Sequence, residues 1–240
     1  MIMETNKIYL GDCYELIKQI PDKSVDCIYT DIPYLYDKGG CSGTELALRM
    51  AKIHKGEIKD IVNGIDYAIF NEFVRVMKKV NCFIWCSKEQ ILPILNWWHE
   101  NTNATYNILT WNKTNPSPMC NGNWLPDIEY CLYFNRQSKL NDGYEFKSKW
   151  FIRPANKTDK DLFNHPTIKP LELVKRHLQH TTQENDIVLD CFIGSGTTAV
   201  ACKELNRQYI GMEISPKWHE IAVNRLKGET ADGQLSFIIK

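Results

Sequence analysis

The segment DIPY, residues 31–34, has the residue types needed for chemistry on a flat, nitrogen-bearing ring. It closes the largely apolar stretch 24–31, and such a stretch is typical of a buried strand. A carboxylate at a strand end can accept hydrogen bonds from an amino group. The proline and tyrosine beside it can form the floor and wall of a pocket. The alternative is an ordinary strand followed by a turn.

A glycine-rich turn forms the second group of candidates. The sequence VLDCFIGSGTTAV (188–200) predicts a strand ending at Asp190, a turn with Gly194 and Gly196, and then a helix. Glycines there let a ligand approach the backbone at a helix N-terminus. The turn also fits G-x-G-x-x-A, and Glu213 follows at the end of the next predicted strand. A nicotinamide dinucleotide is therefore one candidate ligand.

Asp190 favours S-adenosylmethionine over a dinucleotide. Its carboxylate would repel a pyrophosphate, whereas it would attract the ammonium group of a methionine-like moiety. Glu213 can accept the ribose hydroxyls of either ligand, and Ile214 beside it can pack on the adenine face. The alternatives are a helix-capping role for Asp190 and a core position for Ile214.

Short apolar runs alternate with helical patterns along most of the chain. This alternation predicts a doubly wound α/β sheet, and the continuously apolar strands are typical of a sheet covered on both faces. The expected strands are 7–12, 24–31, 82–87, 105–111, 128–134, 186–192 and 208–214. The expected helices are 13–20, 67–80, 88–100, 171–181, 196–205 and 216–226. Two longer segments, 37–66 and 135–165, interrupt the pattern, and long loops are usually functional.

Composition limits the class of protein. With 240 residues and 43% apolar content, the chain suits one domain, residues 1–240, with a sizeable core. The 29 Lys and Arg balance 29 Asp and Glu, so any nucleic-acid contact must come from a local patch. Nine scattered cysteines without C-x-x-C indicate reduced thiols in a cytoplasmic protein, with no metal site. We expect neither a membrane-spanning helix nor a signal peptide.

A basic patch is predicted in the second long segment. Residues 136–180 carry ten Lys or Arg against five Asp or Glu, with aromatic residues between them. Such a mixture suits contacts with phosphates and stacking on bases, and its alternative is a solvated loop. The candidate nucleic-acid contacts are Lys147, Lys149, Arg153 and Lys157. The first long segment starts Gly-rich, and we expect it to form a mobile loop over the pocket.

Three separated segments resemble the beta group of DNA amino-methyltransferases: DIPY, HPTIKP (165–170) and DCFIGSG (190–196). DIPY precedes DCFIGSG, as in that group, and the resemblance covers nearly the whole chain. It implies a Rossmann-like S-adenosylmethionine-dependent methyltransferase fold with permuted motif order and a mainly parallel, seven-stranded sheet. The strands ending at Asp190 and Glu213 would then be neighbours, followed by the N-terminal strand.

The resemblance also implies a reaction. Enzymes of this group methylate the exocyclic amine of adenine or cytosine after the base is flipped out of the duplex. The Asp31 side chain and the Ile32 carbonyl would accept the two amine N–H groups. Pro33 and Tyr34 would hold the ring. A proline is usual at position 32, so Ile32 keeps the carbonyl but loses rigidity. Asp31 favours adenine, because the cytosine enzymes more often carry serine there.

The same resemblance implies the cofactor contacts. Asp12 would meet the cofactor adenine, and its alternative is a helix N-cap. Lys169 would reach the cofactor carboxylate, and its alternative is a helix entry at Pro170. The cofactor-binding candidates are Asp12, His165, Pro166, Lys169, Asp190, Phe192, Gly194, Gly196, Thr197, Glu213 and Ile214.

The expected partner is double-stranded DNA. The segment 135–165 is the candidate for target recognition, and its short length favours few recognised bases or a homodimer on a palindromic site. A cognate restriction endonuclease is left open. Three other functions also stay open: an NAD-dependent dehydrogenase, a methyltransferase acting on RNA or protein glutamine, and a binding protein without catalysis.

Overall fold

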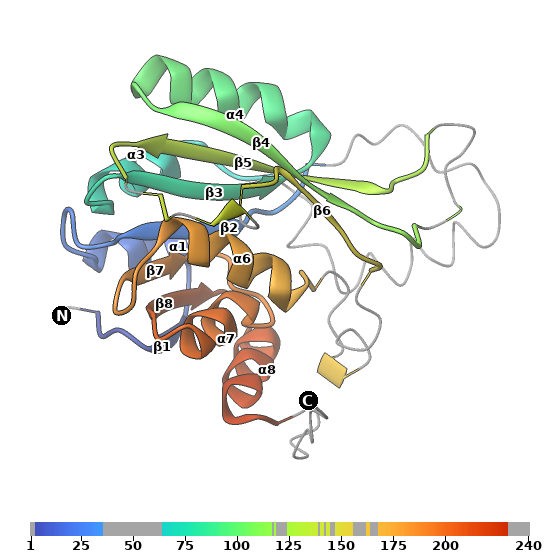
Figure 1. The fold of residues 1–240 in the computed structure, drawn as a ribbon. Helices are drawn as coiled ribbons and strands as arrows, with labels where there is room; N and C mark the ends of the chain where they lie inside the picture. The colour runs from blue at the N-terminus through green and yellow to red at the C-terminus, as the bar shows by residue number, and fades with distance from the viewer. Residues whose placement is uncertain are drawn as a thin grey trace.

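The computed structural model describes residues 3–35, 64–116, 118, 124–138, 140–141, 143–144, 147–155, 162–163 and 168–229. Within these ranges the strands form one eight-stranded sheet in the order β1-β8-β7-β2-β3-β5-β4-β6 (Figure 1). The strands are β1 Lys7–Leu10, β2 Cys27–Asp31, β3 Val80–Cys86, β4 Thr105–Asn112, β5 Ile128–Arg136, β6 Trp150–Ile152, β7 Ile187–Asp190 and β8 Gln208–Glu213. No helix in the described part is both long and apolar enough to cross a bilayer.

The sheet is parallel from β1 to β3 and changes direction at β5. Strand β5 is antiparallel to both β3 and β4, and β6 is parallel to β4. Strands β7 and β8 are neighbours, and β1 lies beside β8 although it comes first in the chain. This arrangement confirms the permuted α/β fold. Because β5 runs against its neighbours, its first residues lie at the same edge as their last residues.

The number of strands differs from the prediction. We expected seven, and the additional strand is β6, which has 3 residues. It lies within the segment 135–165 that the sequence analysis treated as a loop, and it pairs with β4 through Trp111 and Phe151. So short a strand has no period that a sequence pattern can detect. Most of the other long segment, 37–66, lies outside the described residues.

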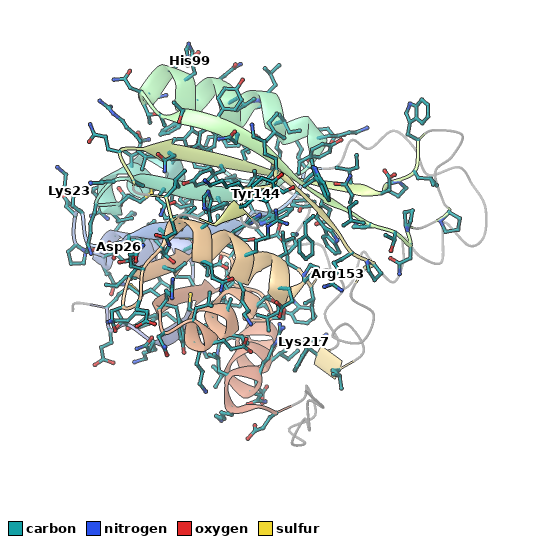
Figure 2. The ribbon with its side chains drawn as sticks, in the orientation of Figure 1. Lys23, Asp26, His99, Tyr144, Arg153 and Lys217 are labelled. Carbon is teal, nitrogen blue, oxygen red and sulfur yellow. The ribbon has the colours of Figure 1, made fainter. Side chains whose placement is uncertain are left out.

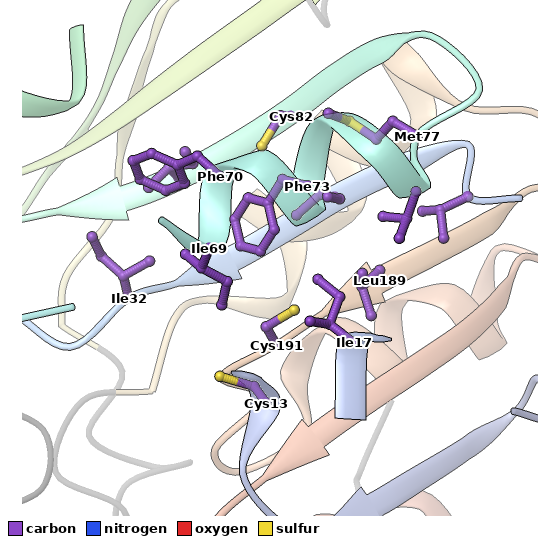
Figure 3. Close-up of a cluster of buried hydrophobic side chains, with 14 of the residues drawn as sticks. Cys13, Ile17, Ile32, Ile69, Phe70, Phe73, Met77, Cys82, Leu189 and Cys191 are labelled. Carbon is purple, nitrogen blue, oxygen red and sulfur yellow. The ribbon is translucent and has the colours of Figure 1, made fainter. Parts of the chain in front are cut away.

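Helices cover both faces of the sheet, as predicted. The helices are α1 Cys13–Leu16, the 3-10 turn η1 Ile17–Gln19, α3 Ile69–Val76, α4 Lys88–Asn101, α6 Leu171–Thr181, α7 Thr197–Glu204 and α8 Pro216–Lys227. Along β2 the buried side chains alternate between two cores: Ile28 belongs to the cluster with α3 and α4, shown in part in Figure 3. Cys27 and Tyr29 belong to the cluster with α6, α7 and α8. The alternation follows from the period of two along a strand.

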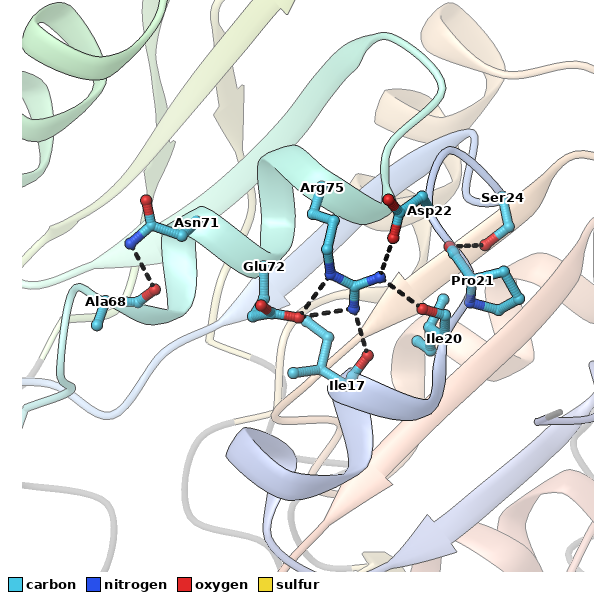
Figure 4. A network of polar contacts seen from close by, with 9 residues as sticks. All are labelled: Ile17, Ile20, Pro21, Asp22, Ser24, Ala68, Asn71, Glu72 and Arg75. Atoms are coloured by element: carbon cyan, nitrogen blue, oxygen red, sulfur yellow. Dashed lines mark hydrogen bonds and ion pairs between the residues drawn. The ribbon is translucent and has the colours of Figure 1, made fainter. Parts of the chain in front are cut away.

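Arg75 ties α3 to the connection that leads into β2 (Figure 4). Its guanidinium donates to the carbonyl oxygens of Ile17 at 3.0 Å and Ile20 at 2.8 Å. It also donates to the Asp22 carboxylate at 2.6 Å, while Glu72 accepts at 2.6 and 2.8 Å. These contacts fix the approach to the strand that ends in DIPY.

Replacing Arg75 by methionine keeps the aliphatic stem and removes all of these hydrogen bonds. The free energy of unfolding should fall by about 2–4 kcal/mol, because bonds to charged groups are stronger than average and two carbonyls lose a donor. Urea denaturation measures the change. The control is Lys18→Met, which removes an exposed ion pair with Glu15 and should leave the midpoint unchanged. Equal midpoints for the two variants would contradict this role of Arg75.

Candidate active site

Asp31 is the last residue of β2 and lies in the middle of the sheet. Strand β2 is flanked by β7 and β3, and Asp31 is in register with Trp85. Oδ2 of Asp31 accepts a hydrogen bond from the Lys169 ammonium at 2.5 Å. Oδ1 is buried and has no hydrogen-bond partner among the described residues. One oxygen is therefore held, while the other can accept an incoming donor.

Lys169 is buried between two carboxylates. Its ammonium lies 2.9 Å from Oε2 of Glu129 and 3.2 Å from the Tyr34 hydroxyl. Burial alone would lower the pKa of Lys169, but Asp31 and Glu129 outweigh it and raise the pKa. Burial alone would raise the pKa of Glu129, but Lys169 and Lys113 lower it to about 2. Both partners are therefore charged at neutral pH.

Asp31 is subject to opposing influences. Burial raises its pKa, the Lys169 charge lowers it, and the Glu129 charge raises it again. The net pKa lies above the ordinary value for an aspartate. Whether this carboxyl group is ionised in the working pH range therefore depends on Lys169.

The contacts of Ile32 explain how isoleucine can stand where a proline is usual. The side chain is 1% exposed and belongs to the core cluster with Ile69 and Phe70 (Figure 3). Its N–H, which a proline would lack, donates to the Trp85 carbonyl at 3.2 Å. The β2–β3 pairing therefore continues one residue past β2. This hydrogen bond restrains the peptide in place of a proline ring.

Two side chains at the start of α4 fix the rest of the DIPY segment. Gln90 donates through Nε2 to the Pro33 carbonyl at 3.0 Å, and its Oε1 accepts from the Ser87 N–H at 3.0 Å. The Ser87 hydroxyl donates to the Leu35 carbonyl at 2.9 Å. Because Gln90 is fully buried, water does not compete for these bonds. The first turn of α4 thus positions the backbone that follows Asp31.

Asp190 ends β7, directly beside β2. Its Oδ1 accepts from the Thr30 hydroxyl at 2.8 Å and from the Phe192 N–H at 3.1 Å, and its Oδ2 accepts from the Thr198 hydroxyl at 2.6 Å. Burial raises the pKa of Asp190 to about 7 despite these donors. The Thr198 contact ties Asp190 to the first turn of α7, but the N-cap of this helix is Gly196, which has no side-chain capping hydrogen bond, so Asp190 does not cap α7. Oδ2 retains a second acceptor site, so contact with a cofactor ammonium stays a prediction.

Glu213 ends β8 and accepts two backbone hydrogen bonds. Gly194 donates to Oε2 and Ser215 donates to Oε1, both at 2.9 Å. Burial raises the pKa of Glu213. Ile214 is 61% exposed, which excludes a core position and leaves an apolar surface beside Glu213. A polar and an apolar group are thus presented together at this strand end.

Asp12 follows β1, the strand on the other side of β8. It is exposed and caps α1, where its Oδ1 accepts from the Tyr14 N–H at 2.9 Å. Gly11 donates to the Glu213 carbonyl at 2.9 Å, so Asp12 lies next to the strand end that carries Glu213. The N-cap interpretation is confirmed, and a contact with adenine stays a prediction.

Gly196 and Thr197 begin α7 and meet α8. Gly196 has a φ of 82°, and a Cβ added there would lie 3.1 Å from the Cβ of Ala222. The Thr197 hydroxyl accepts from the buried Arg225 guanidinium at 2.8 Å, which also lies 3.3 Å from the Ser195 carbonyl oxygen. Backbone conformation and helix packing therefore account for the second glycine. A cofactor role for Gly196 and Thr197 stays a prediction.

The predicted nucleic-acid contacts are described in part. Lys147, Lys149 and Arg153 are exposed, and Figure 2 shows Arg153 beyond the end of β6. The fourth nucleic-acid candidate, Lys157, lies outside the described residues, as do the cofactor-binding candidates His165 and Pro166.

The described ranges contain neither a cluster of metal-ligating side chains nor an exposed cysteine. No group of three or more His, Cys, Asp or Glu side chains there could hold a metal ion. The described cysteines are free and buried: Cys13, Cys27, Cys82, Cys86, Cys131, Cys191 and Cys202. Burial raises the pKa of Cys86, near Asp31, to about 12, so this thiol stays protonated.

Three residues support the site without having been predicted. Glu129 holds Lys169, Gln90 holds the DIPY backbone, and Arg225 holds the glycine loop. A lone acidic residue in the apolar strand 128–134 was the available signal for Glu129. Using that signal requires knowing that β5 runs antiparallel to β3.

Comparison with known proteins assigns this arrangement to a family. A family model described as DNA methylase, for N6 and N4 methyltransferases, matches residues 25–224. The chain belongs to this DNA methylase family. The match includes both DIPY and the glycine loop, so the resemblance found in the sequence is confirmed.

Relatives of similar length support the assignment. The chain is 30% identical to the Type II methyltransferase M2.LlaDCHI of Lactococcus lactis subsp. cremoris, covering 92% of this chain and 89% of that protein. It is 31% identical to the Type II methyltransferase M2.MboI of Moraxella bovis, covering 91% and 86%. The solved M1.HpyAVI–SAM complex is 26% identical, with a TM-score of 0.66 over 94% of this chain and 100% of that one. The PvuII cytosine-N4-specific DNA methyltransferase is 15% identical and shares the fold, with a TM-score of 0.67 over 92% and 86%.

Replacing Gln90 by alanine should slow DNA methylation by about tenfold or more, because small displacements of a catalytic group are costly. Cofactor affinity should stay unchanged, since Gln90 contacts only the DIPY side of the site. Single-turnover rates and calorimetric binding measure the two effects. The control is Lys88→Ala, an exposed change in the same helical turn. A Gln90 variant as fast as this control would contradict the positioning role.

Proposed function

We propose that this protein is a site-specific DNA methyltransferase that transfers a methyl group from S-adenosylmethionine to the exocyclic amine of adenine. The observation that carries the proposal is the state of the Asp31 carboxylate. Lys169 holds one oxygen, and the other is buried without a partner in the described part of the chain. This oxygen lies at the carboxyl end of β2, where open α/β sheets bind their ligands.

An exocyclic amine is a weak nucleophile because its lone pair is delocalised into the ring. Asp31 Oδ1 accepts one amine N–H, and the Ile32 carbonyl accepts the other. The nitrogen then becomes pyramidal and its lone pair is localised. S-adenosylmethionine supplies the methyl group: the nitrogen–carbon bond forms while the carbon–sulfur bond breaks, and sulfur keeps the electron pair. The methylated nitrogen finally releases one proton to solvent.

The ring itself is held by the residues after Asp31. Tyr34 stacks on the base and Pro33 closes the floor of the pocket. A base in a duplex is hidden within the stack, so it must be flipped out to reach this pocket. The contacts of Gln90 and Ser87 fix the backbone on which these two residues are carried.

The ends of β1, β7 and β8 fit the parts of S-adenosylmethionine. Each Glu213 oxygen accepts one backbone N–H and retains an acceptor site for a ribose hydroxyl. Ile214 offers an exposed apolar surface to the adenine ring, and Asp12 an exposed carboxylate to its amino group. Asp190 accepts the ammonium group. A dinucleotide pyrophosphate would instead meet the buried carboxylate of Asp190.

Double-stranded DNA is the proposed substrate. Strands β4 and β6 run parallel to β3, so Arg153 lies at the same edge of the sheet as Asp31. Strand β6 is four positions from β2, which corresponds to roughly 19 Å of sheet. The exposed Lys147, Lys149 and Arg153 then contact phosphates beside the flipped base. The Type II methyltransferase relatives support a restriction partner, and the reduced, buried cysteines suit a cytoplasmic enzyme.

The first test identifies the methylated base. The purified protein is incubated with DNA of mixed sequence and methyl-labelled S-adenosylmethionine, and the DNA is digested to nucleosides. We expect label on the adenine amine. Asp31→Ala should lower the rate by about a thousandfold or more, because it removes the acceptor that activates the amine. Label on cytosine would overturn the choice of base, and no label on either base would overturn the activity.

Cofactor binding should depend on pH through Asp190. Its pKa is about 7 in the free protein, and a bound ammonium group favours the ionised form. The affinity is therefore full above pH 7. Below pH 7, Kd should rise by up to about tenfold per pH unit. Calorimetry between pH 5.5 and 7.5 measures this. Asp190→Asn should bind more weakly with a flat profile, and a flat wild-type profile would contradict the ammonium contact.

A further inference from the structure

Lys169 is restrained on several sides. Its ammonium lies 2.5 Å from Asp31 and 2.9 Å from Glu129. The same atom lies 5.1 Å from the centre of the Trp85 ring and 5.4 Å from that of Tyr34. Only 6% of the side chain is exposed. The position of this cation is therefore fixed by β2, β3 and β5 together.

Glu129 has a partner on each carboxylate oxygen. Oε2 faces Lys169, and Oε1 lies 2.7 Å from Lys113. The charges alternate from Asp31 through Lys169 and Glu129 to Lys113. Because an unmatched buried charge is strongly destabilising, each member of this row holds the next one in place.

We propose that Lys169 is a positioning residue for Asp31, and that Glu129 offsets the positive charge of Lys169 during methyl transfer. The inference rests on the proposed function. By holding Oδ2, Lys169 prevents the carboxylate from rotating, so Oδ1 stays directed at the amine. The orientation of the Asp31 carboxylate is thus fixed through Oδ2, by a residue that does not touch the base.

Glu129 is needed because the amine becomes positive as it gains the methyl group. Asp31 stabilises that charge, but an unbalanced ammonium 2.5 Å from Asp31 would oppose it. Glu129 is ionised, since its pKa is lowered to about 2, so the Lys169–Glu129 pair is neutral as a unit. The attraction between the Asp31 carboxylate and the positive amine is then not cancelled by Lys169, in a site arranged before the charge develops.

The pH at which Asp31 becomes protonated distinguishes a positioning role of Lys169 from a purely structural one. The charged or titratable groups that face it are Lys169, Glu129, Tyr29, Tyr34, Cys86, Cys131 and Asp190. Of these, Lys169 is the cation, and it opposes the rise in pKa that burial causes. The ionised form of Asp31 is the stronger acceptor and the form that stabilises the positive charge developing on the amine, so the rate falls as pH falls through its pKa. Removing Lys169 must move that loss to higher pH.

The main test is the pH profile of Lys169→Met in single-turnover methylation with labelled S-adenosylmethionine. The acid limb should move to higher pH by about one unit or more, because a nearby opposite charge shifts a carboxyl pKa by about one to three units. Raising the pH should restore part of the rate. Cofactor Kd, measured by calorimetry, should stay within about threefold of wild type, since the effect acts through Asp31.

Glu129→Gln should give a different signature. Its maximal rate should fall by about tenfold or more, since Lys169 then opposes the developing charge, and its acid limb should not move upward. The double variant Lys169→Met/Glu129→Gln should be faster than the product of the two single losses predicts. The matched control is Lys175→Met, which removes a 2.9 Å ion pair with Glu204 on the surface of α6 and should change neither property.

Three results would overturn the inference. The first is an acid limb that does not move in Lys169→Met. The second is additive losses in the double variant. The third is weakened cofactor binding with a normal rate at saturation, which would assign Lys169 to the cofactor carboxylate. If Lys169→Met fails to fold by thermal melting, a wild-type maximal rate in Glu129→Gln would overturn it. Failure of the proposed function is distinguishable, because the wild-type protein would then label neither adenine nor cytosine.

Discussion

A buried ammonium group must be matched by negative charge, and at Lys169 this requirement determines how three distant parts of the chain meet. Asp31 comes from β2, Glu129 from β5, and Lys169 from the segment before α6. Moving an ion out of water costs several kcal/mol unless it is paired, so few arrangements of these side chains are stable. The orientation of the Asp31 carboxylate follows from this constraint as much as from the strand that carries it.

The proposed cofactor side of the site depends on backbone donors and helix packing. Glu213 is held by two N–H groups, and the glycine loop is held by Arg225 from α8. Thr30 joins this side to the proposed base pocket, because it precedes Asp31 in β2 and its hydroxyl donates to Asp190 at 2.8 Å. Since β2 and β7 are paired neighbours, a displacement of the Asp31 carboxylate would also displace that of Asp190.

Local patterns in the sequence account for much of this architecture. Helix α6 begins and ends as predicted at 171–181, and Asp31 and Asp190 occupy strand ends, because hydrophobic periods and strand ends are local properties. The third side chain of the charged row could not be predicted in this way. Glu129 reaches the carboxyl edge only because β5 is antiparallel, and strand direction is a property of the whole sheet. Strand β6 was missed because three residues carry no period.

The hydrogen bond from the Ile32 N–H to the Trp85 carbonyl bears on how this motif drifts during evolution. Proline restrains the peptide through its ring, and isoleucine restrains it through one additional rung of the sheet. Both keep the carbonyl that follows the Asp31 carboxylate. The two residues are therefore alternative solutions to one backbone requirement, separated mainly by the volume that Ile32 adds to the core. A sequence search that insists on proline at this position would discard chains in which a hydrogen bond restrains the same peptide.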